Sequence, residues 1–426
     1  METIFAVSSG APPAAIAIVR ISGAQAVAAA TQLAGALPPP RRAALRALRD
    51  SQGLVLDRAL VLLFPAPDTA TGEDVVELHV HGGRAVVRAV EAALGALPGM
   101  RRAEPGEFTR RALLNGRIDL TEAEGLGDLL AAETETQRRA ALAVAEGAIR
   151  RLAEGWTDRL LALAARVEAQ LDFADEDDVA TEAVAPIVNG LLALAGDIEA
   201  VLAAPPVERL RDGLRVVIAG PPNSGKSTLL NRLAERDAAI VSPISGTTRD
   251  RIEAPVVRDG IAYVLTDTAG LAAETADPIE LIGIARAEDA MRGADILLWL
   301  GDAPPANPGA IRVHARADLA GRERLPPGAE IAISAASGLG IADLWRLVRE
   351  RAVQLLPRED ATALNQRQRS LVEACAVAAR SAAAQQDMLL MAEDLRLAMA
   401  ALDHLVGRSD VEAMLDALFR RFCLGK

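Results

Sequence analysis

The residues that point most directly to chemistry form the segment Gly-Pro-Pro-Asn-Ser-Gly-Lys-Ser at positions 220–227. The segment fits the pattern Gly-x-x-x-x-Gly-Lys-Ser/Thr and lies between an apolar stretch typical of a strand and a stretch typical of a helix. Gly220 and Gly225 let the backbone approach phosphates, whose charge is bound by backbone N–H groups and the helix N-terminus. Lys226 is expected to reach the β- and γ-phosphates, and Ser227 to ligate Mg²⁺. The predicted phosphate-binding residues are Asn223, Ser224, Gly225, Lys226, Ser227 and Thr228.

Two further segments match loops that respond to a γ-phosphate. Asp267 opens Asp-Thr-Ala-Gly, where it is expected to act on Mg²⁺ through water while the Gly270 N–H contacts the γ-phosphate. Thr248, in Gly-Thr-Thr-Arg-Asp, is expected to close over Mg²⁺ only while that phosphate is present. Leu271 stands where many such switches place a water-positioning glutamine, and leucine cannot hydrogen-bond a water. The residues predicted to lie at the nucleotide here are Ser242, Pro243, Ile244, Ser245, Gly246, Thr247, Thr248, Asp267, Thr268, Ala269 and Gly270.

The base is expected to meet the segment Ala-Arg-Ala-Asp at 315–318. Guanine readers usually carry Asn-Lys-x-Asp at this place. Asp318 can still accept hydrogen bonds from guanine, and the stem of Arg316 can cover the ring, but Ala315 lacks the usual amide. The residues Ser334, Ala335 and Ala336 lie where a loop N–H would meet the guanine O6. The pattern therefore favours GTP over ATP, with weakened affinity left open.

Composition limits the remaining classes of protein. The 426 residues are 51 % hydrophobic and carry a net charge of −12, which argues against a broad, nonspecific nucleic-acid binder. No uncharged apolar run of about 18 residues predicts a membrane span, and the first residues lack the basic region of a signal peptide. Cys375 and Cys423 have neither disulfide-framework nor zinc spacing, so a reducing cytoplasm is expected.

Pattern changes along the chain predict a multidomain protein. Residues 1–116 mix strand and helix patterns in an α+β domain, and 117–210 show the helical spacing of a bundle. Residues 211–356 alternate strands with helices, as in an α/β domain with a mostly parallel sheet. Helical spacing returns over 357–426. The simplest arrangement is a helical domain interrupted by an inserted α/β domain, with the two helical stretches packed together.

Several segments resemble one family. They are the segment 103–130, which begins Ala-Glu-Pro-Gly-Glu-Phe-Thr, the acidic stretch 171–177, the three nucleotide motifs, and the terminal Phe-Cys-Leu-Gly-Lys at 422–426. Together they make the chain resemble the MnmE (TrmE) family of tRNA-modifying GTPases over almost its whole length. The resemblance implies that 1–116 is a folate-binding and dimerisation domain, and that 211–356 is the GTPase domain.

The resemblance also suggests how hydrolysis proceeds without a glutamine. Members of the family place K⁺ beside the phosphates when two GTPase domains meet in a homodimer. The implied K⁺ ligands are Asn223, Ser242, Ile244 and Thr247, and the implied Mg²⁺ ligands are Ser227 and Thr248. The family's water-positioning glutamate matches Glu280, although one extra residue precedes it here. Without the resemblance, Asn223 is interpreted as a turn-capping residue and Glu280 as a solvated helix residue.

By the same resemblance, the first domain binds 5-formyl- or methylene-tetrahydrofolate. The implied contacts are Arg20, Glu77, Arg117 and Lys426, which would otherwise be ordinary surface charges. Cys423 matches a cysteine considered catalytic in the family, and the alternative is a small apolar helix residue. His79 and His81 are interpreted as strand residues beside the folate cleft, and Cys375 as a core residue.

The family works with the flavoprotein MnmG, in a heterotetramer, on the wobble uridine of certain tRNAs. It adds an aminomethyl or carboxymethylaminomethyl group at C5, with folate as the carbon source. Basic residues with a possible RNA contact are Arg101, Arg102, Arg110 and Arg111, although each is more typical of a solvated charge. Two alternatives stay open: a GTPase of ribosome assembly without covalent RNA chemistry, and a scaffold that has lost turnover.

Overall fold

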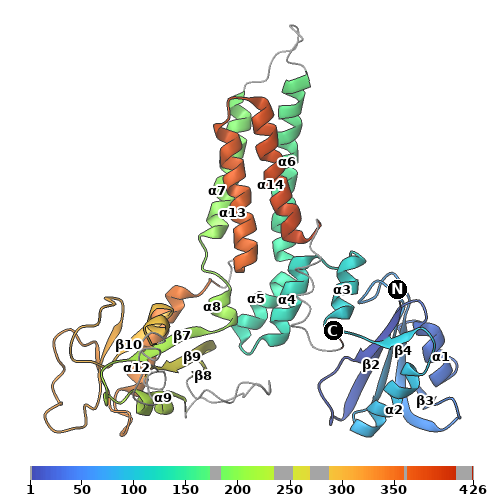
Figure 1. The fold of residues 1–426 in the computed structure, drawn as a ribbon, viewed down its shortest axis with the longest axis horizontal. Coiled ribbons are helices and arrows are strands. Elements are labelled where there is room, and N and C mark those ends of the chain that lie inside the picture. Colours follow the sequence, from blue (N-terminus) through green and yellow to red (C-terminus); the bar gives the residue numbers. More distant parts are fainter. Residues whose placement is uncertain are drawn as a thin grey trace, which may run out of the picture. The chain divides into compact units, whose positions relative to one another are not determined.

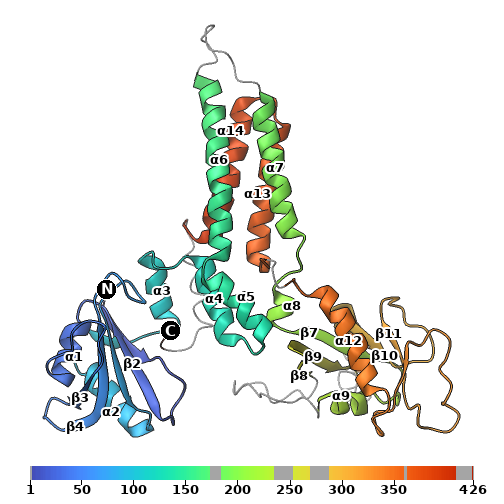
Figure 2. The same cartoon turned by 180° about the vertical axis from the view of Figure 1, so that it is seen from behind.

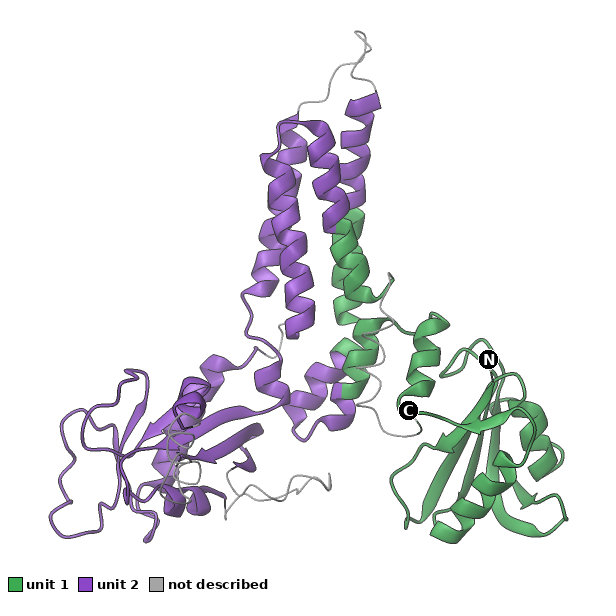
Figure 3. Cartoon of the chain, in the orientation of Figure 1, with its two compact units in different colours: residues 1–127, 144–159, 399–426 green, residues 128–143, 160–398 purple. Residues whose placement is uncertain are grey.

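A computed structural model of the protein describes residues 2–172, 184–234, 253–268, 287–358, 362–408 and 425. The chain divides into two compact units, shown in Figure 3. Unit 1 comprises residues 1–127, 144–159 and 399–426, and unit 2 comprises residues 128–143 and 160–398. Four helices contribute residues to both units: α4 (Leu120–Ala131), α5 (Glu135–Ala145), α6 (Ala148–Asp172) and α14 (Met388–Val406).

Unit 1 is an α+β unit, as its mixed sequence patterns predict. Figure 1 labels most of its elements, which are β1 (Thr3–Val7), β2 (Ile16–Ser22), α1 (Ala26–Ala34), β3 (Ala44–Arg49), β4 (Val55–Phe64), β5 (Val75–His81), α2 (Arg84–Gly95), β6 (Met100–Arg102) and α3 (Glu107–Leu114).

The sheet of unit 1 has six strands in the order β3-β4-β5-β2-β1-β6. Only β1 and β6 pair in parallel. Successive side chains of a strand point to opposite faces of a sheet. Alternate apolar residues therefore form the core with α1 and α2, among them Val19 and Ile21 of β2 and Val76 and Leu78 of β5. The intervening residues of the same strands, which include Arg20 and Glu77, share the opposite face.

Unit 2 combines long helices with a second sheet. Its own elements are α7 (Val184–Leu202), α8 (Glu208–Arg211), β7 (Leu214–Ala219), α9 (Lys226–Ala234), β8 (Glu253–Arg258), β9 (Ile261–Asp267), β10 (Ile296–Trp299), β11 (Ile311–His314), β12 (Ile331–Ala332), α12 (Ile341–Leu355) and α13 (Gln366–Ala384).

The sheet of unit 2 has the order β12-β11-β10-β7-β9-β8. All its neighbours are parallel except β8, which pairs antiparallel with β9. Helices α9 and α12 cover one face, where Leu229, Leu344 and Trp345 pack against strand residues such as Val216 and Leu265. Apolar runs on both sides of the central strands are typical of such a doubly covered parallel sheet. This confirms the predicted α/β domain with a mostly parallel sheet.

The two helical stretches that flank the α/β part pack together, as the inserted-domain arrangement predicts. Helices α7 and α13 lie side by side in Figures 1 and 2. Ile187, Leu191, Leu194 and Ile198 recur along one side of α7 and are fully buried. Cys375 of α13 is also fully buried, and burial raises the pKa of its thiol to about 12, which confirms its interpretation as a core residue. Among the described residues, α7 is also the one helix that is long and apolar enough to cross a membrane, by length and composition alone.

Candidate functional site

The phosphate-binding segment connects β7 to α9. Gly220 and Gly225 have φ angles of 150° and 97°, which favour glycine, and Asn223 also has a left-handed φ of 57°. The ammonium of Lys226 lies back across the loop and donates to the carbonyl oxygens of Gly220 and Pro221, both at 3.0 Å. Burial lowers the pKa of Lys226, and the nearby Asp267 carboxylate opposes that shift in part. The segment thus holds one buried cation among backbone groups at the start of a helix.

The side of the site predicted to hold Mg²⁺ is built by two neighbouring strands. Because β9 runs parallel to β7 with Asp267 opposite Ile218, the end of β9 lies beside the phosphate-binding segment. The Ser227 hydroxyl donates to Asp267 Oδ2, and the Thr268 hydroxyl donates to the Ile218 carbonyl at 3.0 Å. A hydroxyl and a carboxylate that face each other are oxygen ligands of the kind Mg²⁺ takes together with substrate phosphates. The described residues therefore fit the predicted ion.

A cavity of about 290 Å³ adjoins this segment. It is lined from the start of α9 and from the loops after β11 and β12. It brings the residues predicted to meet the base, Ala315, Arg316, Asp318, Ser334, Ala335 and Ala336, together with Ser224, Gly225 and Thr228 of the predicted phosphate-binding set. Asp318 is exposed, whereas Ala315 and Ser334 are buried. The cavity thus adjoins the exposed carboxylate Asp318 and the loop that holds Ser334, Ala335 and Ala336.

The tetrahydrofolate prediction falls on an ion pair in unit 1. Arg20 and Glu77 are direct cross-strand partners, and the guanidinium donates twice to Glu77 Oε1, at 3.0 and 2.9 Å. Glu77 Oε2 lies 3.2 Å from His79 Nε2. Burial raises the pKa of Glu77, but the hydrogen bonds from His79 and Arg20 outweigh it, and the net pKa is lowered. Arg117 pairs instead with Asp68, at 3.2 Å.

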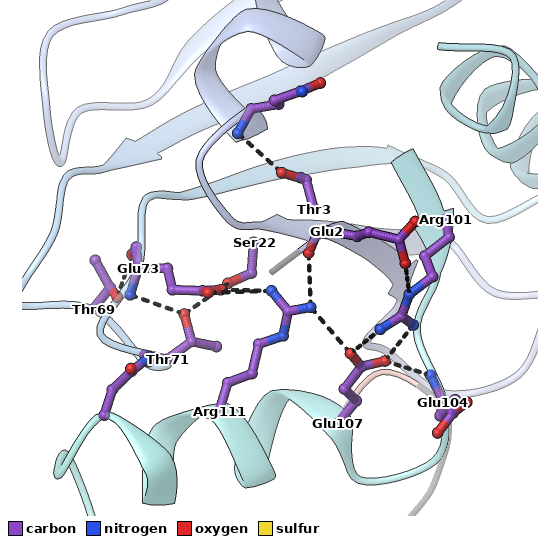
Figure 4. A network of polar contacts seen from close by, with 12 residues as sticks. Glu2, Thr3, Ser22, Thr69, Thr71, Glu73, Arg101, Glu104, Glu107 and Arg111 are labelled. Carbon is purple, nitrogen blue, oxygen red and sulfur yellow. Dashed lines mark hydrogen bonds and ion pairs between the residues drawn. The ribbon is translucent and has the colours of Figure 1, made fainter. Parts of the chain in front are cut away.

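A second charged network in unit 1 is shown in Figure 4. Arg111 is only 3 % exposed and donates to Glu73 at 2.9 Å, to Glu107 at 3.0 Å and to the Glu2 carbonyl at 2.8 Å. Arg101 pairs with Glu107 and Glu2. Burial raises the pKa of Glu107, but the bonds from Arg101 and Arg111 and from the Glu104 N–H lower it overall. Both interpretations of Arg111, a solvated charge and a possible RNA contact, are therefore wrong, because its guanidinium is buried and bound to Glu73, Glu107 and the Glu2 carbonyl.

Comparisons with known proteins agree with this geometry. The family model "MnmE helical domain" matches residues 120–423, and the model "GTP-binding protein TrmE N-terminus" matches residues 3–117. Proteins named tRNA modification GTPase MnmE are similar over the full chain. Those of Erythrobacter litoralis and Rhizorhabdus wittichii are 54 % and 56 % identical, covering 100 % of this chain and 100 % and 97 % of their own.

This chain belongs to the MnmE (TrmE) family of tRNA modification GTPases. Among solved structures, the G domain of the T. maritima FeoB iron transporter matches 33 % of the chain at 20 % identity, with a TM-score of 0.22.

The MnmE-family residues predicted from the sequence fall into two groups. Those of the phosphate-binding segment, the base cavity and the Arg20–Glu77 pair lie at the positions described for each site. The others lie outside the described residues: Ser242, Pro243, Ile244, Ser245, Gly246, Thr247, Thr248, Ala269, Gly270, Glu280, Cys423 and Lys426. The predicted roles of both groups remain predictions.

One residue that sequence patterns do not identify is Arg322. Its Nε donates to the Ala315 carbonyl at 3.0 Å, and its terminal nitrogens donate to Asp302 at 3.1 and 2.9 Å. His314 Nε2 lies 2.8 Å from the Arg322 carbonyl and its Nδ1 lies 3.2 Å from Arg322 Nη2, so one neutral tautomer satisfies both contacts. Arg322 thus ties the base-binding loop, which lacks the usual asparagine, to the end of β10.

The positions of the two lysines in the chain give information that the motifs do not. The sequence has 46 lysines and arginines together, yet lysine occurs only at Lys226 and Lys426. A lysine ammonium is a compact point charge, unlike the broad, planar guanidinium of arginine. Both lysines fall at positions predicted to bind a cofactor.

Proposed function

We propose that this chain binds and hydrolyses GTP in the cytoplasm and, together with the flavoprotein MnmG, modifies C5 of the wobble uridine of certain tRNAs. The added group is aminomethyl or carboxymethylaminomethyl. The observation that carries the proposal is the arrangement around the start of α9, where a buried lysine, the Ser227–Asp267 pair and the base cavity adjoin one another. Membership of the MnmE family supplies tRNA as the substrate.

The chain's own residues divide the work on GTP. Lys226 neutralises the β- and γ-phosphates from a position already held by two backbone carbonyls. Ser227 and Thr248 would ligate Mg²⁺, with Asp267 acting on the ion through water, and the ion would supply further positive charge at the transferred phosphoryl group. Asp318 accepts from the guanine edge and so selects GTP over ATP. Competition binding tests this selection, because a preference for ATP would overturn it.

Water activation is assigned to a pair of GTPase domains rather than to Leu271. Asn223 is exposed and has a left-handed backbone, so its amide oxygen is available at the surface of the phosphate-binding segment. With Ser242, Ile244 and Thr247 it would hold K⁺ when two chains form a homodimer, and Glu280 would position the water. GTP turnover is then expected to be faster in K⁺ than in Na⁺. Equal rates in the two salts would remove the K⁺ role.

The one-carbon unit is assigned to unit 1. Glu77 offers a carboxylate to the N–H edge of a pterin, while Arg20, Arg117 and the terminal Lys426 offer cations to folate carboxylates. Glu77→Gln and Arg20→Ala should each weaken binding of 5-formyl-tetrahydrofolate, measured by calorimetry. Arg102→Ala is a matched control, because Arg102 is 67 % exposed and forms a surface pair with Glu91. Unchanged affinity in both site variants would contradict this assignment.

The whole proposal is tested by the wobble nucleoside itself. In a strain that lacks this chain, mass analysis of tRNA should show loss of the modified nucleoside, and expression of the intact chain should restore it. A strain that keeps the nucleoside but accumulates immature ribosomes would instead support the alternative of a ribosome-assembly GTPase.

A further inference from the structure

Gln137 makes an unusually complete set of hydrogen bonds inside unit 2. It is 7 % exposed and lies in the first turn of α5. Its N–H donates to the Thr134 hydroxyl at 3.2 Å, and its side-chain oxygen accepts from the N–H groups of Glu133 and Thr134, both at 2.8 Å. This is a capping box, which satisfies the unpaired N–H groups at the start of a helix.

The nitrogen of the same side-chain amide bonds to a different helix. Gln137 Nε2 donates to the carbonyl oxygens of Leu210 at 2.9 Å and Arg211 at 3.1 Å. Both carbonyls belong to the last turn of the short helix α8, where carbonyl groups have no partner within the helix. One side chain therefore caps the start of α5 and the end of α8 together.

Helix α8 immediately precedes β7, the first strand of the GTPase domain. Arg209 of α8 donates to Asp295 Oδ1 at 2.9 Å, just before β10, and Asp295 Oδ2 accepts from the Arg215 N–H at 3.0 Å, in β7. On the side where the chain leaves that domain, Glu208 accepts from the Gln366 N–H at 2.7 Å, at the start of α13. Strand β7 then runs directly to Gly220 of the phosphate-binding segment.

A cavity of about 220 Å³ lies beside Gln137 and Arg211 and extends to Val256 and Tyr263 of the β8–β9 edge. Next to this cavity, the two hydrogen bonds from Gln137 Nε2 connect α5 to α8.

We propose that Gln137 is a positioning residue that couples the GTPase domain to the helical segment through α8. In this proposal, a structural change at the nucleotide displaces β7 and the segment before β10, and these displace α8. The hydrogen bonds of Gln137 then transfer the displacement of α8 to α5. The inference rests on the proposed function, because it assigns a route by which GTP hydrolysis is used for tRNA modification.

The chemistry of the amide allows the two capping roles to be separated. In Gln137→Glu, a carboxylate still accepts from Glu133 and Thr134, and glutamate suits a capping box as well as glutamine does. It cannot donate, however, and it places negative charge against the carbonyls of Leu210 and Arg211. Gln354→Glu is the matched control, because Gln354 is an exposed residue of α12 that undergoes the same change in charge.

The experiment compares intact chain, Gln137→Glu and Gln354→Glu in two assays. The first is GTP turnover by purified protein, and the second is mass analysis of the wobble nucleoside in a complemented deletion strain. Gln137→Glu is expected to keep GTP turnover within about twofold while the modified nucleoside falls about tenfold, a usual size for coupling between two sites. Gln354→Glu should match the intact chain in both assays.

Each other result overturns the inference and identifies the part that fails. Wild-type modification in Gln137→Glu removes the coupling role and leaves the proposed function intact. Parallel loss of turnover and modification, with a lower unfolding temperature, shows that Gln137 only stabilises the fold. Absence of modification with the intact chain removes the proposed function itself.

Discussion

The nucleotide site of unit 2 and the Arg20–Glu77 site of unit 1 hold their charges in different ways. Within the described part of the chain, the Lys226 ammonium donates to two carbonyls of its own loop, which do not neutralise its charge. Arg20 and Glu77 already neutralise each other across two strands. A ligand at the second site must therefore join or displace an existing ion pair. The phosphate-binding segment of the first site is contiguous backbone, whereas the second site consists of side chains that the sheet brings together.

The largest effect is expected from breaking the charged network of unit 1 around Arg111. Arg111→Ala leaves Glu73 without its cation, while Glu107 keeps Arg101, and removing one partner of a buried ion pair costs about 3–5 kcal/mol. Hydrogen exchange should show weaker protection of β2 and β5, with GTP turnover retained. Arg102 provides the control, since its side chain is 67 % exposed and pairs with Glu91, so Arg102→Ala should cost less than Arg111→Ala. Unchanged protection in Arg111→Ala would contradict the role of the network.

The next effect concerns the first site alone. Lys226→Met should reduce GTP turnover by about 10²–10³-fold, the usual loss when one charge-stabilising donor is removed from a reaction centre. Protection of β2 and β5 should stay unchanged. Arg346→Met, at an exposed surface pair of α12, is the control. Turnover close to that of the intact chain would show that the phosphate-binding segment is not the reaction centre.

A smaller effect is expected at the base-binding loop. Arg322→Ala should raise the KM for GTP about tenfold, or about 1.4 kcal/mol, with kcat nearly unchanged, because binding of the ground state and of the transition state is weakened equally. Adding Ala315→Asn should recover part of the loss by restoring the family's usual amide. Arg324→Ala, at an exposed neighbour in the same loop, should leave KM unchanged. An unaltered KM in Arg322→Ala would show that the bonds of Arg322 do not stabilise the loop for GTP binding.

Acid should affect unit 1 through the same network, with the smallest of these effects. The pKa of Glu107 is lowered below 4.5 in the folded protein, so its stabilising contribution is present above that pH and is lost as pH falls through the folded-state value. Protection of β2 and β5 should therefore fall on acidification, and less steeply in Glu107→Gln. An identical pH profile for the two proteins would exclude this carboxylate as the cause.

Sequence patterns predict those parts of the fold that contiguous residues determine. The segment from Gly220 to Ser227 is identifiable because phosphate binding uses successive backbone groups. Alternation identifies β2 and β5 as strands, yet it does not give the register that sets Arg20 opposite Glu77. Strands β3 and β8 have weaker strand patterns, because β3 carries arginines within its apolar pattern and β8 contains Pro255, which is tolerated in an edge strand.

The residues that sequence reasoning misses act on distant backbone. Gln137 stands three residues after Thr134, which is the spacing of a capping box and does predict its bonds within α5. Its other partners are the carbonyls of Leu210 and Arg211, and Arg322 likewise binds the carbonyl of Ala315. Every residue has a backbone carbonyl. The type of the accepting residue therefore does not indicate such a hydrogen bond in the sequence.

The central claim is that the two sites serve one reaction, and Glu77→Gln tests it most directly. This change leaves the nucleotide site untouched, so purified protein should hydrolyse GTP at the rate of the intact chain. Mass analysis of tRNA from cells that carry only this variant should nevertheless show strong loss of the modified wobble nucleoside. A wild-type level of that nucleoside would contradict the claim.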